Sequence, residues 1–115
     1  AAAGRLEQIQ AQVTDVSQPL PLEDHCVDVC LMATVLHDLV QERTDQTALQ
    51  EVRRVLKNKG TLAVVEFKKI EGPPGPPVAI RLSREECRER LRSLGFDFVR
   101  HLDVGPYHYL ACFTK

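Results

Sequence analysis

Two short apolar runs on either side of an amphipathic stretch constrain the fold of this 115-residue chain more than any other feature. Residues 26–32 and 61–67 are rich in Val, Leu and Cys and carry one acidic residue each. The apolar residues between them share one face of a helix: Ala48, Leu49, Val52, Val55 and Leu56. A buried strand, a helix and a second buried strand are the repeating unit of parallel α/β sheets. The sequence therefore predicts an α/β fold.

Local signals bound the two longer helices. Thr44 or Asp45 can cap the first helix, and Gly60 is expected to end it in the left-handed conformation. The second helix is expected to start at the capping box Leu82-Ser83-x-x-Glu86 and to end at Gly95. Residues 37–42 predict a short helical turn. The first four residues look like the end of a helix stopped by glycine, or a remnant of cloning.

The remaining segments predict strands and loops. Apolar residues alternate with Gln over 9–13, which is typical of a half-buried strand. Two further strands, about 96–104 and 107–114, are joined by Gly105-Pro106, so an antiparallel hairpin is expected. The proline-rich stretches 17–24 and 71–77 predict loops, the second of them stiff and extended.

Charge and cysteine content exclude several classes of protein. Fifteen Lys+Arg against sixteen Asp+Glu leave a net charge of −1, with no basic patch for nucleic acid or an anionic membrane. No apolar run approaches the length of a membrane-spanning helix, and no leader peptide opens the chain, so we expect a cytoplasmic protein. The four cysteines form no Cys-x-x-Cys pair, which predicts reduced core thiols and no metal site.

A series of motifs occurs in one order along residues 9–115. They are Asp15, Leu20-Pro21-Leu22, Asp28-Val29-Cys30, Val35-Leu36-His37-Asp38, the run from Arg54 to Gly60, and Gly95-Phe96. Together they resemble the C-terminal part of a class I S-adenosylmethionine-dependent methyltransferase of the ubiquinone- and menaquinone-biosynthesis type. The resemblance implies a Rossmann-like sheet of strand order 3-2-1-4-5-7-6, of which this chain holds strands 3 to 7 and the antiparallel C-terminal hairpin.

Residues 1–115 are therefore interpreted as the C-terminal part of a single methyltransferase domain. No Gly-x-Gly occurs, so the Gly-rich turn that lets the backbone approach the cofactor is absent. Without strands 1 and 2, the segment 26–32 is expected to expose an unpaired edge, which invites pairing with a second copy of the chain. The sequence thus predicts a homodimer formed through this edge, or else a rearranged sheet or poor solubility of these residues alone.

The resemblance also implies site residues. Asp15 and the backbone of Val16 would contact the adenine ring of the cofactor, although a loop Asp can also simply cap a turn. Met32, Ala33 and Thr34 would face its methionine part. His37 matches the first His of a Leu-His-His pattern, and it would orient the acceptor or act as a base. The alternative for His37 is a capping or packing role at a helix start.

The implied function is S-adenosylmethionine-dependent methyl transfer to a small-molecule acceptor, as part of a longer enzyme. Without the Gly-rich turn, these 115 residues are not expected to bind the cofactor alone. The alternative is a catalytically silent, methyltransferase-like module that binds a partner, so the sequence leaves open whether the chain is an enzyme.

Overall fold

A computed structural model describes residues 8–115, and the helix end expected at residues 1–4 lies outside them. The four strands are β1 (Val27–Ala33), β2 (Leu56–Phe67), β3 (Asp97–Val104) and β4 (His108–Thr114). The helices are α2 (Leu36–Glu42), α3 (Asp45–Val55) and α4 (Arg84–Ser93), with a 3-10 turn, η1 (Val78–Ile80), before α4. Within this described part of the chain, every helix is too short or too polar to cross a bilayer.

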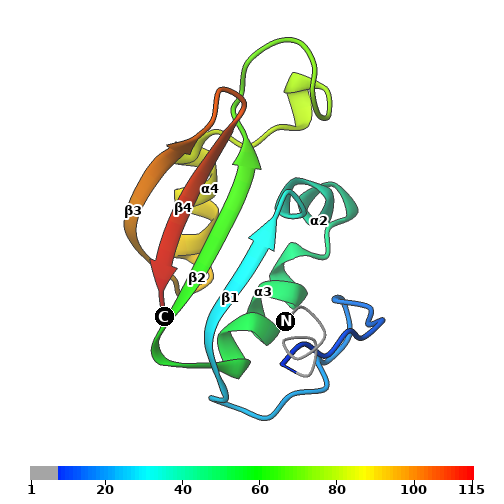
Figure 1. Cartoon of the computed structure of the whole chain (residues 1–115), viewed down its shortest axis with the longest axis vertical. Helices are drawn as coiled ribbons and strands as arrows, with labels where there is room; N and C mark the ends of the chain where they lie inside the picture. The colour runs from blue at the N-terminus through cyan, green and yellow to red at the C-terminus, as the bar shows by residue number, and fades with distance from the viewer. Residues whose placement is uncertain (1–7) are drawn as a thin grey trace.

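The strands form one mixed sheet in the order β1-β2-β4-β3 (Figure 1). β1 and β2 run parallel, with Val29 beside Thr61 and Ala33 beside Val65, and α3 lies on the connection between them. β4 pairs antiparallel with both β2 and β3. The predicted strand–helix–strand unit and the predicted C-terminal hairpin are therefore confirmed, and β1 is an edge strand as expected.

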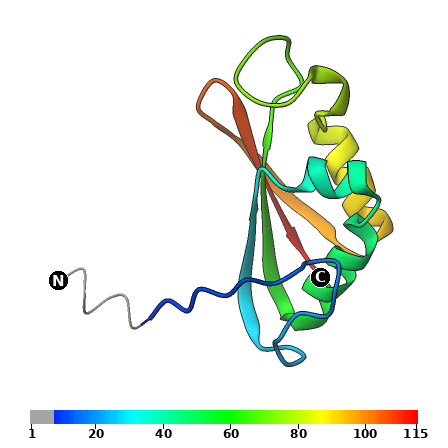
Figure 2. The same cartoon turned by 90° about the vertical axis from the view of Figure 1, so that its right-hand side faces the viewer.

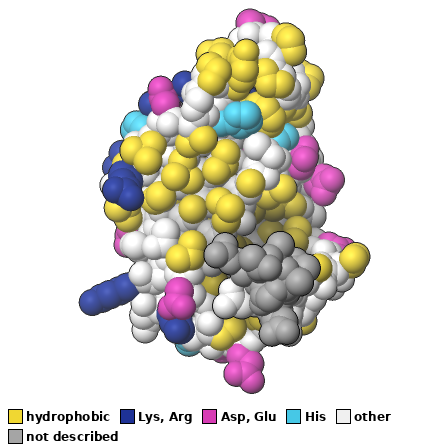
Figure 3. Space-filling model, viewed as in Figure 1, with side chains coloured by type: hydrophobic (Ala, Val, Ile, Leu, Met, Phe, Trp, Pro, Cys, Tyr) yellow, Lys and Arg dark blue, Asp and Glu magenta, His cyan; other side chains and the backbone are white. Residues whose placement is uncertain are grey.

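In the part of the chain that the structure describes, the helices all pack on one face of the sheet, and no helix covers the other face (Figure 2). An apolar run such as 26–32 is typical of a strand covered on both faces, and that expectation is wrong here. Val29 and Leu31 of β1 point to the open face and are 60% and 62% exposed. Apolar side chains gather over this face of the sheet (Figure 3).

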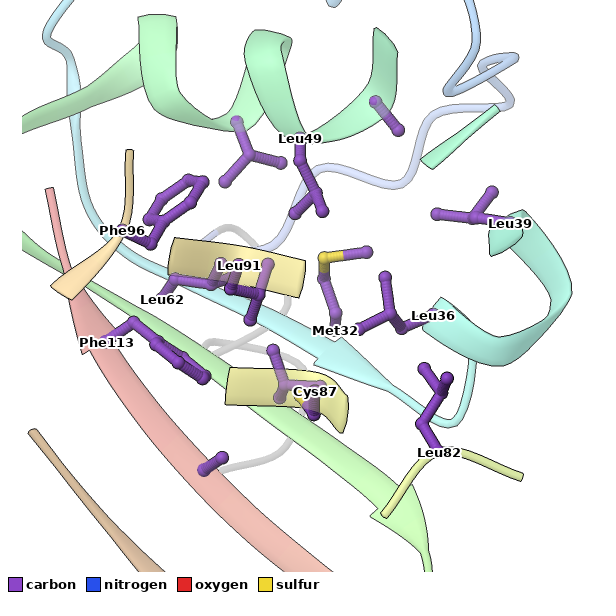
Figure 4. Packing of buried hydrophobic residues seen from close by; sticks show 14 of the residues in the cluster. Met32, Leu36, Leu39, Leu49, Leu62, Leu82, Cys87, Leu91, Phe96 and Phe113 are labelled. Carbon is purple, nitrogen blue, oxygen red and sulfur yellow. The ribbon is translucent and has the colours of Figure 1, made fainter. Parts of the chain in front are cut away.

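The core lies between the sheet and the three helices (Figure 4). The fully buried side chains that meet there come from every layer: Leu36, Leu49, Leu62, Cys87, Leu91, Phe96 and Phe113. Burying one such aliphatic or aromatic side chain contributes roughly 1.5–3 kcal/mol. This core docks α2 and α3 against β1 and β2, whose carboxyl ends hold the site described below.

The strand expected over residues 9–13 is not formed. These residues have no regular structure, and Ile9 and Val13 are fully or largely exposed. An alternating pattern produces a strand only where a neighbouring strand satisfies its backbone and a core covers its apolar face. Among residues 8–115, no strand is placed to pair with this segment.

Helix ends follow the sequence in α4 but not in α3. Ser83 and Glu86 form the predicted capping box at the start of α4. Thr44 precedes α3 without a side-chain cap. At the other end β2 begins directly at Leu56, and Lys59, not Gly60, has a positive φ of 65°. Gly60 is required for space instead, because a Cβ there would lie 2.8 Å from the Lys57 carbonyl oxygen.

Candidate functional site

The carboxyl ends of β1 and β2 lie side by side because the two strands are parallel (Figure 1). β1 leads into α2, and β2 leads into the Gly-Pro-Pro loop, residues 71–77. Open α/β sheets bind their ligands outside the carboxyl ends of the strands. The region between β1, α2 and this loop is therefore the candidate binding site.

A cavity of about 500 Å³ follows the free edge of β1. Four consecutive residues of the strand, Cys30 to Ala33, line it although their side chains alternate between the two faces of the sheet. The other lining residues come from α2, α3 and the N-terminal loop: Val16, Leu20, Val35, Asp38, Leu39, Glu42, Ala48 and Val52. The lining is mainly apolar, with two carboxylates contributed by α2.

Three of the five residues predicted to bind the cofactor, Val16, Met32 and Ala33, line this one cavity. The structure thus brings together two segments that are 16 residues apart in the sequence. Asp15 and Thr34 are not among the lining residues. Asp15 accepts hydrogen bonds from the Ser17 hydroxyl at 2.7 Å and the Ser17 N–H at 2.9 Å. These bonds, the hydroxyl first, hold the pKa of its carboxyl below the ordinary value.

Thr34 follows β1 in the left-handed region, with φ 56°. Its N–H donates to the Val65 carbonyl at 2.7 Å, which ties the end of β1 to β2. A threonine in this conformation is strained, and such strain is often found at binding sites.

The N-terminal loop is held against α3 by two charged side chains. The Glu51 carboxylate accepts the Leu20 N–H at 2.7 Å. The Arg54 guanidinium donates to the Leu20 and Leu22 carbonyls and binds both Glu51 and Asp24. The bond from Arg54, more than that from Leu20, lowers the pKa of Glu51. This anchorage explains why Val16 and Leu20 lie at the cavity despite being in a loop.

His37 is buried at the start of α2 and binds a buried carboxylate on β2. Its Nδ1 lies 2.9 Å from Oε2 of Glu66, which is 0% exposed. Glu66 also accepts the His37 backbone N–H at 2.9 Å and the Phe67 N–H at 3.2 Å. On the other side of the imidazole, Nε2 lies 3.4 Å from Oδ1 of Asp38. The imidazole therefore lies between two carboxylates.

Glu66 is the functional candidate that sequence reasoning missed. Leu62, Val64 and Glu66 alternate along β2 and all three are fully buried. A carboxylate in register with two core aliphatic residues must have a buried partner, because an unpaired charge there is very costly. This register was the available signal, but only the tertiary structure identifies His37 as the partner.

The Gly-Pro-Pro loop packs on the ring of Phe67. A Cβ on Gly75, which has φ 102°, would lie 2.6 Å from that ring. The Phe67 ring contacts His37 edge-on at 5.9 Å between centroids and His108 at 4.5 Å. The loop, Phe67 and His37 thus form a continuous wall at the end of β2.

Arg81, which is 3% exposed, organises this loop from within. Its guanidinium donates to the carbonyls of five residues: Lys68, Ile70, Gly72, Pro74 and Pro76. The prolines were expected to make this loop stiff. The buried Arg81 guanidinium restrains it as well, because it binds the loop's carbonyl oxygens.

Two other reactive groups of the core lie close to Glu66. Burial raises the pKa of the Cys87 thiol to about 12. Burial, followed by the nearby Cys87 and Glu66, raises the pKa of Tyr109, whose hydroxyl donates to the Leu82 carbonyl at 2.7 Å. Both groups are therefore protonated at neutral pH, and neither is a nucleophile.

Known proteins match this chain both in sequence and in fold. A family described as a methyltransferase domain matches residues 1–64. The ubiquinone/menaquinone biosynthesis C-methyltransferase of Xylella fastidiosa is 33% identical over 107 residues, which are 93% of this chain and 37% of that protein. This chain thus spans little more than a third of the length of that curated relative.

Solved structures match over nearly the whole chain. An S-adenosylmethionine-dependent methyltransferase from Aquifex aeolicus is 26% identical with a TM-score of 0.81, over 97% of this chain and 60% of that one. The 1,6-didemethyltoxoflavin-N1-methyltransferase of Burkholderia thailandensis, solved with S-adenosylhomocysteine, has a TM-score of 0.71 at 19% identity, over 99% of this chain and 56% of that one.

The similarity to the Burkholderia thailandensis enzyme, at 19% identity, shows the fold alone. The match to the methyltransferase-domain family covers more than half of this chain. The predicted incomplete Rossmann-like sheet is confirmed, since this chain occupies only part of each related structure. The chain belongs to the class I S-adenosylmethionine-dependent methyltransferases and corresponds to part of their domain.

Proposed function

We propose that these residues form the acceptor-facing part of a longer enzyme, which transfers a methyl group from S-adenosylmethionine to a small molecule. The observation that carries this proposal is the cavity at β1, which brings Val16, Met32 and Ala33 together beside α2. We propose the cytoplasm as its compartment, because the four cysteines are free thiols, which persist in reducing surroundings.

The apolar side chains and carboxylates around the cavity fit part of the cofactor. Its apolar lining suits the adenine ring, and the carboxylates of Asp38 and Glu42 suit the ribose hydroxyls or the sulfonium cation. Ser17 binds Asp15 through Oδ1, so we assign Oδ2 to the adenine amino group. The backbone from Met32 to Thr34 is assigned to the methionine part. No Gly-x-Gly is present to cradle the rest.

The chemistry needs positioning more than side-chain catalysis. S-adenosylmethionine, when bound, supplies a methyl group on a sulfonium sulfur. The acceptor must be held in line with that bond, and holding two reactants in line accounts for much of the rate in such reactions. His37 is proposed to orient the acceptor or to take up the proton that it loses.

One observation favours a second candidate function, a catalytically silent binding module. His37 is buried, and both of its ring nitrogens lie near carboxylates of the chain itself. In that case the cavity would serve a partner or a regulatory ligand and His37 would have only its structural role at the start of α2.

Calorimetric titration with S-adenosylhomocysteine separates the two functions. We expect tight binding by a longer natural chain that includes the Gly-rich turn, and weak or no binding by these 115 residues. In the longer chain, Ala33→Phe should fill the cavity and lower the affinity at least tenfold, whereas Ala79→Phe, at an exposed position, should not. Absence of binding by both chains would overturn the enzyme proposal in favour of the silent module.

A further inference from the structure

Two residues far apart in the sequence, His37 and Glu66, form a buried hydrogen-bonded pair beside the cavity. The imidazole is 5% exposed and the carboxylate is 0% exposed. Both oxygens of Glu66 lie near Nδ1, at 2.9 and 3.1 Å. A carboxylate is only an acceptor at neutral pH, so the hydrogen of this bond belongs to Nδ1.

We infer that Glu66 is a positioning residue that holds His37 as the Nδ1–H tautomer, so that Nε2 accepts the proton of a protic acceptor. This inference rests on the proposed function and narrows its substrate class. The acceptor would carry a hydroxyl, an enol or an acidic C–H at the atom that is methylated.

Asp38 separates Nε2 from the cavity, because His37 is buried and is not itself a lining residue. Asp38, whose carboxylate lies 3.4 Å from Nε2, is itself a lining residue of the cavity. Asp38 is largely exposed on its other side and can rotate away from the ring. Rotation of Asp38 would open Nε2 to an acceptor in the cavity, and the return of its carboxylate would stabilise the imidazolium once Nε2 has taken a proton.

Among residues 8–115, the other elements around His37 contribute no competing partner for Nδ1. The edge contact with Phe67 comes from β2, and behind that ring lie the Arg81 guanidinium, 5.6 Å from its centroid, and His108. On the far side of Glu66 the neutral Cys87 and Tyr109 fill the core. Glu66 is the group that the structure places within hydrogen-bonding distance of Nδ1.

Methyl transfer to a protic acceptor requires a base that takes up the acceptor's proton. The bond from sulfur to the methyl carbon breaks with its electron pair left on sulfur, and a new bond joins that carbon to the acceptor oxygen or carbon. The acceptor's proton moves to Nε2 of His37 and the sulfonium charge is lost, so the net change is one proton released to water when His37 resets. No oxidant or reductant takes part.

A purely structural role for Glu66 is the competing explanation, because its carboxylate also caps the start of α2 through the His37 N–H. Glu66→Gln separates the two roles. The amide oxygen of Gln can still accept the backbone N–H groups, while its NH2 group faces Nδ1 and can only donate to it. The variant should therefore keep α2 in place and switch His37 to the Nε2–H tautomer.

The direct test is the tautomer of His37, read from long-range ¹H–¹⁵N correlation spectra of this chain at neutral pH. His37→Gln assigns the signals. We expect a protonated Nδ1 and an unprotonated Nε2 in the wild type, and the reverse in Glu66→Gln. A wild-type ring protonated only at Nε2, or a tautomer that Glu66→Gln leaves unchanged, would overturn the inference.

Turnover by the longer enzyme supplies a second readout. Glu66→Gln and His37→Gln should each lower kcat about 100-fold or more, and the double variant should lose little further, because both act on one proton transfer. Glu89→Gln, on the exposed face of α4, is the matched control. If the longer enzyme does not bind the cofactor, the proposed function is refuted but the tautomer result still holds. If the cofactor binds but His37 is not the Nδ1–H tautomer, only this inference is refuted.

Discussion

Neither Lys59 nor Gly60 caps α3, and the positive φ expected at Gly60 is found at Lys59 instead. Lys59 has a φ of 65°, a conformation that costs a non-glycine residue about 1–2 kcal/mol. Gly60 keeps a negative φ and is surrounded by the Lys57 and Asp28 carbonyl oxygens, at 2.8 and 3.2 Å from a Cβ built on it. The pair illustrates that a glycine can be required for close backbone approach as well as for its φ.

Substitutions at these two neighbouring positions should change the stability of the fold in opposite directions. Gly60→Ala should destabilise the fold by about 1–3 kcal/mol, because a methyl group would overpack against backbone. Lys59→Gly should stabilise it by roughly 0.5 kcal/mol, the relief of strain being partly offset by the greater freedom of the unfolded chain. Urea unfolding of the two variants checks both signs, and stabilisation by Gly60→Ala would contradict the packing argument.

Glu86 makes part of the stability pH-dependent. Bonds from Lys69, at 2.7 Å, and from the Ser83 N–H hold its pKa below the usual value of 4.5. Since the pKa is lowered on folding, the stabilisation is fully present above the usual pKa of 4.5 and is lost as the pH falls through the lowered pKa. Glu86→Gln should therefore destabilise the protein at pH 6, and its difference from the wild type should shrink as the pH falls.

The measurement is the free energy of unfolding between pH 6 and pH 3. The side chain of Glu86 is about half exposed, so we expect an effect on the scale of one helix cap, about 1 kcal/mol or less. Glu89→Gln is the control, because Glu89 lies on the same helix and pairs only with the exposed Arg92. An equal pH dependence in both variants would count against the role of Glu86.

At the scale of elements, the Gly-Pro-Pro loop depends on a residue outside itself. Arg81 follows η1 and reaches back to carbonyls on both limbs of the loop. A guanidinium has five N–H donors in a planar fork, whereas a lysine ammonium is a single point with three. The loop's shape at the end of β2 is therefore a property of the Arg81 side chain as much as of its prolines.

Arg81→Lys should release the loop. We expect a loss of about 2 kcal/mol or more in stability, because several carbonyls lose their buried donor at once. Hydrogen exchange should become faster at Ile70 and Ile80, whose N–H groups donate to carbonyls of the loop and its flanks, while the amides of β2 and β4 stay protected. Arg92→Lys, on the exposed face of α4, should change neither quantity. Unchanged exchange in the loop would show that the prolines alone hold it.

The open side of the sheet is the main feature at the scale of the whole molecule. β1 is an edge strand of the four-stranded sheet (Figure 1). Its Val29 and Leu31 are exposed on the uncovered face. Residues 29–33 contain no Lys, Pro or other device that blocks edge-to-edge pairing. Antiparallel pairing of two copies about Cys30 would put Val29 of one opposite Leu31 of the other. The homodimer expected from the sequence remains a prediction, and these features support it.

Leu31→Lys tests that dimer. A charge at the centre of the exposed edge should shift the chain to monomer, with little effect on its own stability because Leu31 is 62% exposed. Sedimentation equilibrium over a range of concentrations measures the change, and Val99→Lys on the opposite edge strand β3 is the control. A wild-type chain that is monomeric at every concentration would refute the prediction.

Local and periodic features of the sequence were enough for most of the architecture. The α3 stripe, the two apolar runs on either side of it, the Ser83–Glu86 capping box and the turn at Gly105 each depend on neighbours within a few residues. The ordered motifs from Leu20 to Phe96 led to the correct family for the same reason, since they mark strand ends and turns. Such local patterns predict the same elements in any fold that buries one face of the helix and one face of the sheet.

Pairings between distant segments were decided only by the tertiary structure. Whether 9–13 is a strand depends on a neighbouring strand, and whether 26–32 is covered on two faces depends on helices elsewhere; both expectations were wrong. The Glu66–His37 bond joins residues 29 apart, and Arg81 finds its carbonyl acceptors through the fold of a loop. Composition and period describe one segment at a time, whereas a buried charge is satisfied by whichever group the packed chain brings to it.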